Sequence, residues 1–356
     1  MPSFAAANWF GDDEGPQELS PEHPFLLLGQ DEPEPFGSLE EAIRRADNGS
    51  TIELHTNDPI ELSGFDLDRD IVIRAAPGMR PVLVFRPGPD GHDVLFATDS
   101  HLSLEGLEVH VEPRSEDERL TAIEIHGAEL RIIHCQIMNP SGTGIVADEA
   151  QRIVIEDTEI QCPREAAIAC DLAAGGQLEI RTSFLTGQDP LRMSVFADDV
   201  EVQLIDTALL GRHAVAVESE FDVDSDEARH VDFVAHRTAF LSAGEPLLLV
   251  AEEMPDGEAV AKVIEWEGRE NTWQARGVVD DPAPMIGVDI EDDEFDIPDW
   301  SPETLEEWRE LSSVTEEDSL WGDETRSAHF DEAFDLIERG DFIPRELMLR
   351  DHSCDE

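Results

Sequence analysis

The stretch Gly144-Ile-Val-Ala-Asp-Glu-Ala-Gln-Arg-Ile-Val-Ile-Glu-Asp-Thr-Glu-Ile160 decides the fold. It contains two short apolar segments, Ile145 to Ala147 and Ile153 to Ile155, and then a polar turn at Glu156-Asp157. Counted from Ile153 as position 0, the inward residues fall at positions 0, +2, +5 and +7. The jump from +2 to +5 is expected where a two-residue turn interrupts a strand whose side chains alternate between two faces.

The same pattern recurs along most of the chain. Position 0 is predicted at Ile71, Leu102, Leu130, Ile153, Leu178, Val202, Phe233 and Trp266. Subtracting successive numbers gives intervals of 31, 28, 23, 25, 24, 31 and 33 residues. A period in the twenties, made of short strands without helices between them, is typical of a solenoid of stacked coils.

A further short strand precedes position 0 in the central coils. These strands are predicted at Val94 to Phe96, Ile123 to Ile125, Ile145 to Ala147, Ile168 to Cys170, Val195 to Ala197 and Val215 to Val217. Each coil therefore has three strands and three turns. Stacking would bury one apolar column from each strand and pair each backbone with its neighbours about 4.8 Å away.

Position +5 is small and polar in six coils. Its residues are Cys135, Thr158, Ser183, Thr207, Thr238 and Asn271. Hydroxyl and amide groups stacked inside a turn can bond along the stack and to the turn backbone, which makes their burial tolerable. We therefore expect an inner polar column at this position.

The segment Ile153 to Ile160 resembles the short repeat of the right-handed parallel β-helix (pectin-lyase-like) family. That repeat is apolar-x-apolar-x-x-Asn-x-apolar, and Thr158 stands in the Asn place. The segments Gly37 to Ile43 and Asn48 to Leu54 are similar to the family's capping helix and first strand. The resemblance implies an all-β, right-handed parallel β-helix solenoid over residues 37–280. It implies no single function, because the fold hosts lyases, hydrolases, adhesins and inert binding modules.

The chain is predicted to have three parts. Residues 1–36 form an acidic, Pro-rich leader whose apolar island, Phe25 to Leu28, docks on the main domain. Residues 37–280 form the solenoid, which begins with a helix that Ser38 caps. Residues 281–356 form an acidic tail with helices after Ser301 and near residues 329–338. The tail either caps the open end of the solenoid or docks a partner.

The charge of the chain limits its partners. There are 83 Asp and Glu against 24 Lys and Arg, a net charge of −59, and Lys262 is the sole lysine. Such acidity disfavours nucleic acids and anionic lipids. It indicates either adaptation to a salty cytoplasm or a localised binding face. We expect a cytoplasmic protein, because no apolar run is long enough for a membrane span and no signal peptide is recognised.

The cysteines predict neither a disulfide framework nor a zinc site. Cys135, Cys162, Cys170 and Cys354 lack the C-x-x-C spacing, so reduced thiols are expected, with Cys135 in the core. The sequence leaves the oligomeric state open.

One candidate binding site is a ladder on the outward face of the strands that precede position 0. Its predicted members are His126, Asp148, Asp171, Asp198 and Glu218, one from each successive coil. Stacked carboxylates repel one another unless a cation, a raised pKa or solvent relieves them. The alternative is a solvated acidic face.

Catalytic and metal alternatives rest on other residues. Asp171 with Asp198 and Asp199 resembles the carboxylate set of polysaccharide hydrolases of this fold, although His213 lies at the start of its strand. A lyase would need an Arg or Lys base beside calcium-binding carboxylates, and no such base is identified. Calcium could bind at Asp222, Asp224 and Asp226, although Glu227 stands where an EF-hand needs Gly. No other cofactor is expected.

The favoured function is a non-catalytic β-helix scaffold or binding module that presents an acidic face to a protein or carbohydrate partner. A polysaccharide hydrolase or lyase that uses the outward Asp residues is the alternative. A further alternative is an accessory module of bacterial kinase signalling, although the chain carries no kinase motif of its own.

Overall fold

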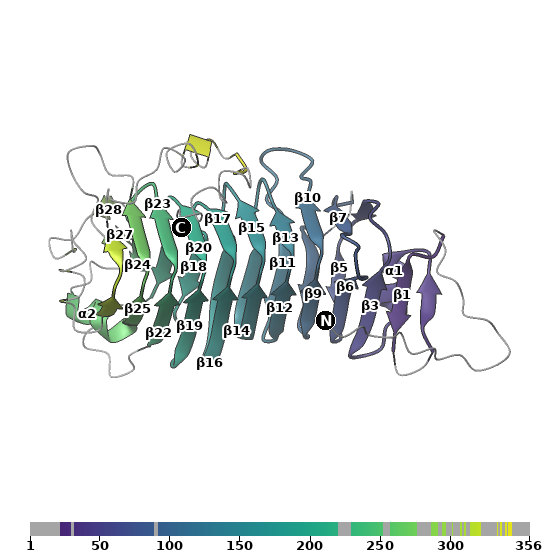
Figure 1. Cartoon of the computed structure of the whole chain (residues 1–356), viewed down its shortest axis with the longest axis horizontal. Coiled ribbons are helices and arrows are strands. Elements are labelled where there is room, and N and C mark those ends of the chain that lie inside the picture. Colours follow the sequence, from purple (N-terminus) through teal and green to yellow (C-terminus); the bar gives the residue numbers. More distant parts are fainter. Residues whose placement is uncertain are drawn as a thin grey trace, which may run out of the picture.

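The part of the chain that the structure describes is mostly β-strand. The computed structural model describes residues 22–29, 32–88, 92–219, 229–251, 257–275, 286–290, 294–296, 301, 307, 310, 314–321, 333, 335–336, 339 and 341–343. Figure 1 shows the strands lying side by side along the long axis of the molecule. Nearly all strand pairs are parallel, as expected for stacked coils.

Each coil contributes one strand to each of three columns. The first column holds β5 (Phe65–Leu67), β8 (Val94–Thr98), β11 (Thr121–His126), the start of β14 (Ile145–Glu156), the start of β16 (Ile168–Arg181), β18 (Leu191–Ser194), β21 (Val215–Glu218), β24 (Leu247–Ala251) and β27 (Ile286–Ile290). The second column holds β3 (Ser50–Leu54), β6 (Ile71–Ala75), β9 (Leu102–Glu105), β12 (Glu129–Ile133), the ends of β14 and β16, β19 (Val200–Ile205), β22 (Val231–His236), β25 (Ile264–Arg269) and β29 (Val314–Glu317).

The third column is a separate ten-stranded parallel sheet. It holds β4 (Ile60–Leu62), β7 (Val82–Phe85), β10 (Glu108–Val111), β13 (Gln136–Met138), β15 (Glu159–Cys162), β17 (Phe184–Gly187), β20 (Ala208–Gly211), β23 (Ala239–Ser242), β26 (Thr272–Ala275) and β30 (Leu320–Trp321). The first two columns merge into one sheet because β14 and β16 run through both.

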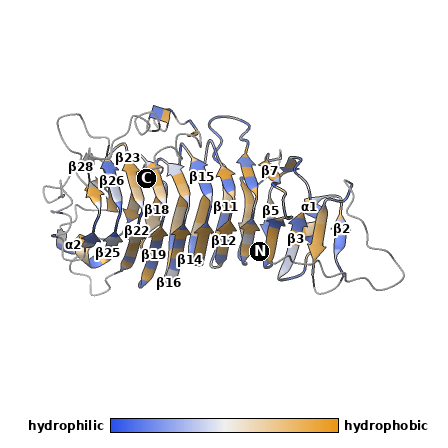
Figure 2. Ribbon diagram, viewed as in Figure 1, coloured by the Kyte–Doolittle hydropathy of each residue, from blue (hydrophilic) through white to orange (hydrophobic). Residues whose placement is uncertain are grey.

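The register of the second column confirms the repeat. Ile153 pairs with Leu130 on one side and with Leu178 on the other. The pairing continues in phase to Trp266, so every predicted position 0 from Ile71 onward shares one column. These apolar side chains belong to one continuous core, and Figure 2 shows the matching apolar stripes along the strands. The inward phase of the sequence pattern is therefore correct.

The phase jump arises from one left-handed residue at position +4 of most coils. Asp157 has φ 47°, and most other coils also have a positive φ at this position. The residues are Gly106, His134, Asp157, Thr182, Asp206, Arg237, Glu270 and Asp318. Asn and Asp tolerate this conformation better than most residues, whereas Thr182 is β-branched and bears backbone strain there. The bend that it makes leads the chain from the second column into the third.

The predicted inner polar column forms at position +5. The Thr158 hydroxyl accepts from the Cys135 backbone N–H at 3.2 Å and donates to the Glu156 carbonyl at 2.8 Å. The Ser183 hydroxyl in turn accepts from the Thr158 N–H at 3.1 Å. Thr158 and Ser183 are both buried, so these bonds satisfy backbone groups that water cannot reach.

Short elements pack at the N-terminal end of the stack. Ser38 caps helix α1 (Leu39–Arg45), because its hydroxyl accepts from the Glu41 N–H at 3.2 Å. Strand β1 (Phe25–Leu28) pairs antiparallel with β3 and buries Phe25 and Leu27, which confirms that the apolar island docks on the main domain. Strand β2 (Glu34–Phe36) pairs antiparallel with β1.

The sequence pattern predicted that the repeat stops at about Asp280, but the repeat continues beyond it. Strands β27, β29 and β30 extend the three columns by parallel pairing with β24, β25 and β26. Helix α2 (Gly257–Val263) precedes β25, and β28 (Glu294–Asp296) pairs antiparallel with β27. The last coil was missed because its position +2 is an acid, Glu316, rather than an apolar residue. Where the domain boundaries fall stays a prediction.

Glu316 is buried among the aromatic residues of the preceding coil. Its carboxylate accepts from the indole N–H of Trp266 at 2.7 Å and of Trp273 at 3.2 Å, and from the Asn271 amide at 2.9 Å. Its cross-strand partner is Gly268, where an added Cβ would lie 1.5 Å from a Glu316 carboxylate oxygen. Glycine at this position thus makes room for the acid.

Two described residues after β30, Ala333 and Ile343, lie against the ten-stranded sheet. Ile343 exchanges two backbone hydrogen bonds with the buried Gln161 side chain, at 2.8 and 3.1 Å. Ala333 and Ile343 pack with Leu210 and Leu241 in a small second core. Of the helices expected in the tail, helical turns are described at residues 307 and 310 and at 333, 335 and 336. These contacts are with the side of the stack, whereas β28 and Ser301 contact β27 in the last coil.

Three cysteines are buried free thiols. They are Cys135, Cys162 and Cys170. Burial raises the pKa of Cys135 to about 11 and that of Cys170 to about 12, so neither is a reactive thiolate at neutral pH. Cys354 lies outside the described residues. Among the described residues, no helix is long and apolar enough to cross a lipid bilayer.

Candidate functional site

The structure brings four of the five predicted ladder residues into one outward column. His126 pairs with Asp148, and Asp171 follows in the next coil, directly after the Ala147–Cys170 pair. Glu218 lies two coils beyond Asp171. We call His126, Asp148, Asp171, Ser194 and Glu218 the ladder, since Ser194 occupies the intervening coil.

Asp198 is not part of the ladder. Strand β18 runs from Leu191 to Ser194, so Ser194 pairs with both Asp171 and Glu218. Asp198 and its neighbour Asp199 lie exposed in the turn that leads into β19. The apolar alternation continues past the strand end to Val195, which is buried, and this shifted the predicted phase. The expected ladder position of Asp198 is therefore wrong.

Several contacts moderate the negative charge of the ladder. His126 lies between Asp148, at 3.3 Å, and Glu124, at 3.1 Å. The Ser194 hydroxyl donates to Glu218 at 3.3 Å, and an Arg192 guanidinium nitrogen lies 3.9 Å from the same carboxylate. A basic residue thus adjoins the ladder, contrary to the sequence interpretation.

Asp171 is the ladder carboxyl with the most perturbed environment. Its partial burial, and then the charges of Asp148 and Glu149, raise the pKa of Asp171 above its ordinary value. Arg229 acts in the opposite direction. The ladder therefore favours either a proton or a bound cation at Asp171.

An exposed aromatic ring adjoins this face. Phe196 is 45% exposed, and the Arg229 guanidinium lies 5.4 Å from its ring centroid. Such a contact is typical of cation–π pairing. Arg229 is also close enough to Asp171 to lower its pKa, so the aromatic ring and the ladder belong to one surface.

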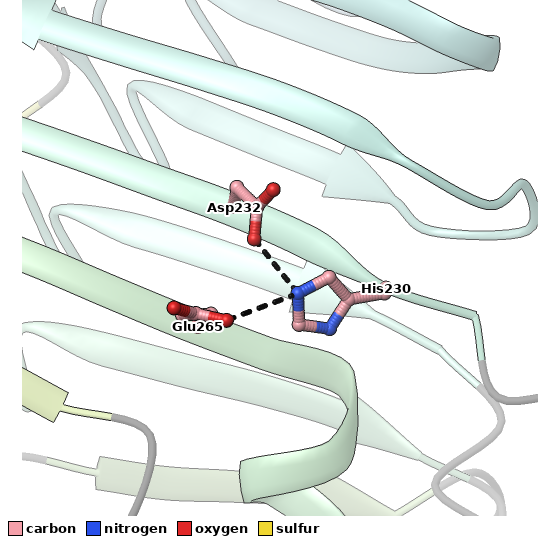
Figure 3. Close-up of side chains that lie close together, drawn as sticks. All are labelled: His230, Asp232 and Glu265. Carbon is pink, nitrogen blue, oxygen red and sulfur yellow. Dashed lines mark hydrogen bonds and ion pairs between the residues drawn. The ribbon is translucent and has the colours of Figure 1, made fainter.

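A second cluster, which the sequence reasoning missed, contains His230, Asp232 and Glu265. The His230 Nε2 atom lies 2.7 Å from an Asp232 carboxylate oxygen and 3.6 Å from one of Glu265 (Figure 3). Asp232 and Glu265 are cross-strand partners on β22 and β25. Their ligand atoms and that of His230 all lie within 4.8 Å of one another. The sequence signal was present, because Asp232 and Glu265 both occupy position −1 of their coils.

The other ring nitrogen of His230 is held by the backbone. Nδ1 lies 3.1 Å from the Lys262 carbonyl oxygen, which can only accept a hydrogen bond. Burial lowers the pKa of His230, but the Lys262 carbonyl and the carboxylates of Asp232 and Glu265 outweigh it and raise the pKa above its ordinary value. Nε2 is consequently directed at the two carboxylates.

His213 is buried, whereas the resemblance to polysaccharide hydrolases would require a histidine on an open face. Its ring is buried, with Nδ1 2.8 Å from Asp189 and Nε2 3.8 Å from Glu245. The three residues lie in stacked turns just before β18, β21 and β24. His213 therefore lies between two carboxylates of the adjacent coils and connects three stacked turns.

An open groove of about 960 Å³ lies elsewhere, along the turns between the second and third columns. Its lining includes His134, Asp157, Thr182 and Arg237. None of the ladder residues lines it. The predicted calcium residues Asp222, Asp224 and Asp226 lie outside the described residues.

Comparisons with known proteins identify no relative. No protein-family model, no curated protein and no solved structure matches this chain. The function must therefore be argued from the two sites themselves.

Proposed function

We propose that the chain is a right-handed parallel β-helix that serves as a binding module, and that its ladder binds a cationic segment of a partner protein. The fold part of the proposal is supported by the three parallel columns and by the resemblance of the repeat. Parallel crossover connections are right-handed in about 98% of cases. Helix α1 and strand β1 cover the first coil at the N-terminal end, as a cap would.

One observation carries the binding part. Three carboxylates, from Asp148, Asp171 and Glu218, share one outward column, and the pKa of Asp171 is raised by its burial and its acidic neighbours. A cationic side chain placed over Asp171 would relieve this repulsion and gain a charge-assisted hydrogen bond. From Asp148 to Glu218 the carboxylates extend over three coil spacings, about 14 Å. A row of this length suits an extended peptide better than a compact ligand.

The test compares two triple variants with the same change in charge. A labelled octalysine peptide is titrated against the wild type, against Asp148→Asn/Asp171→Asn/Glu218→Gln, and against Glu129→Gln/Glu156→Gln/Glu201→Gln. The control residues lie on β12, β14 and β19 in the second column. At about 0.15 M salt, where distant charges are screened, we expect at least tenfold weaker binding for the ladder variant and less than twofold for the control.

An equal loss in both triple variants would refute the localised site. The acidity would then be a property of the whole surface, as salt adaptation predicts. Urea unfolding of all three proteins checks that the variants remain folded.

A polysaccharide lyase is the second candidate, and the position of Arg192 favours it. The resemblance implies an Arg or Lys base beside calcium-binding carboxylates, and Arg192 lies 3.9 Å from Glu218 on the ladder face. Polygalacturonate with calcium is the substrate to test, and the ultraviolet absorbance of unsaturated products is the readout. Activity that Arg192→Gln abolishes would support the lyase, and an inactive wild type would remove it. The signalling-module alternative is tested by whether a kinase gene lies next to this gene.

A further inference from the structure

We propose that His230, Asp232 and Glu265 form a binding site for a divalent transition-metal ion of the zinc class. Each residue offers one ligand atom, and the three atoms converge from two adjacent coils. One imidazole nitrogen with two carboxylate oxygens is a donor set that suits zinc, which binds His and Asp or Glu at about 2.0–2.2 Å. The site is independent of the ladder and of the proposed partner.

The backbone orients the histidine as a metal ligand. Because the Lys262 carbonyl accepts from Nδ1, the Nε2 atom is the one directed at Asp232 and Glu265. A second hydrogen bond of this kind is what fixes the tautomer and the ring plane of metal-binding histidines. The Lys262 carbonyl comes from the end of α2, and Glu265 follows on β25. One connection thus supplies both the orienting group and a ligand.

The two distances from His230 lie near those expected around a bound ion, and the two carboxylates lie within 4.8 Å of each other. Two ligands at about 2.0 Å from a tetrahedral ion are about 3.3 Å apart. The Nε2 to Glu265 distance is 3.6 Å, close to that value, whereas the Nε2 to Asp232 distance is 2.7 Å, which is a hydrogen bond. Asp232 has 51% of its side chain exposed and can move by the remaining few tenths of an ångström. The ion would lie between Nε2 and the two carboxylates, in place of the contact between His230 and Asp232.

The site is open on its solvent side. Side-chain exposures are 30% for His230, 51% for Asp232 and 68% for Glu265. Three protein ligands with solvent access leave a fourth position for water, the arrangement of open zinc sites rather than of closed structural ones. The negative charge of the chain further raises the local concentration of cations.

Zinc is the probe, and two matched histidine variants form the comparison. Competition with a chromophoric chelator measures zinc affinity for the wild type, for His230→Gln and for His134→Gln. His134 lies 3.3 Å from a single carboxylate, Asp157, on another part of the surface, so it controls for loss of one exposed histidine. We expect at least a tenfold loss of the tightest zinc affinity for His230→Gln and no change for His134→Gln. Glu265→Gln, which removes an exposed ligand, should also lose at least tenfold.

Crystals soaked in zinc chloride locate the ion by its anomalous signal. We expect a peak about 2 Å from the His230 Nε2 atom. Equal zinc affinity in the wild type and His230→Gln, or anomalous peaks at other residues only, would overturn the proposal. Tight binding of calcium without zinc would overturn it too, because calcium takes only oxygen ligands. If His230→Gln does not fold, Glu265→Gln and the anomalous map decide.

Discussion

Two columns of polar side chains run along the stack, and they obey different constraints. The inner column at position +5 is buried and hydrogen-bonded to the backbone, as Thr158 and Ser183 show. The ladder on the outer face is partly exposed, and its members contact mainly one another and nearby charges. The inner column therefore stabilises the fold, whereas the outer one is available to a partner.

The difference explains which prediction succeeded. If a strand slipped by one residue, its apolar side chains would leave the core, so packing fixes which residues of the strand point inward. Nothing comparable fixes an outer residue. Leu191, Met193 and Val195 are all buried, so the alternation alone did not show that the strand ends at Ser194. Asp198 was misplaced for this reason.

The largest change in stability is expected at Glu316, the buried acidic residue of the last coil. Glu316→Leu should lower the free energy of unfolding by about 3 kcal/mol, because it removes a buried carboxylate that accepts hydrogen bonds from Trp266, Trp273 and Asn271. Removing a buried carboxylate also removes its desolvation penalty, and this keeps the net loss below the sum of three hydrogen bonds. Urea unfolding, followed by tryptophan fluorescence, measures the change.

Glu317→Leu is the matched control for this prediction. Glu317 is the next residue on β29 and is exposed, so its replacement should change stability by less than about 0.5 kcal/mol. Equal losses in the two variants would show that the buried carboxylate is not what holds the last coil.

The limits of the sequence follow from the same contrast. The columns, the positions of the turns and the inner polar residues were predictable, since each rests on the repeat of apolar residues. The last coil was not predictable, because Glu316 occupies a core position. Its burial is tolerated only because the indole N–H groups of Trp266 and Trp273 bind its carboxylate. The His230 cluster was not predictable either, because it depends on a carbonyl contact from Lys262 that no residue type encodes. The pairing of Asp232 with Glu265 could have been predicted from their shared position −1, but the approach of His230 to them could not.

A smaller effect is expected within the inner column itself. Thr158→Val keeps the shape of the side chain but removes a hydroxyl that accepts from the Cys135 N–H and donates to the Glu156 carbonyl. We expect a loss of about 1–2 kcal/mol in the free energy of unfolding, since a buried N–H is left unpaired. Thr51→Val, on the outward face of β3, should change stability by less than about 0.5 kcal/mol. Similar losses of stability in Thr158→Val and Thr51→Val would show that the buried hydroxyl stabilises the fold no more than an exposed one.

The smallest effect, and one of opposite sign, is expected on the ladder. The pKa of Asp171 is raised in the folded protein, mainly by burial and by the charges of Asp148 and Glu149. The folded state therefore binds the proton more tightly than the unfolded state, and stability falls as pH rises from the unfolded value of about 3.9 through the folded one. Asp171→Asn should make the protein more stable at pH 7, by less than about 1 kcal/mol because solvent screens the site. The gain should shrink when unfolding is measured near pH 3.

Asp206→Asn provides the reverse case under the same conditions. The Arg237 guanidinium, bound to Asp206 at 2.6 and 2.7 Å, lowers the pKa of that carboxyl. Its contribution to stability is present above the unfolded pKa and is lost as pH falls through the folded value. The variant should therefore be slightly less stable than the wild type at pH 7 and equal to it at low pH. If Asp171→Asn behaved like Asp206→Asn, the ladder would be a set of stabilising contacts, and the contrast between an inner structural column and an outer binding column would fail.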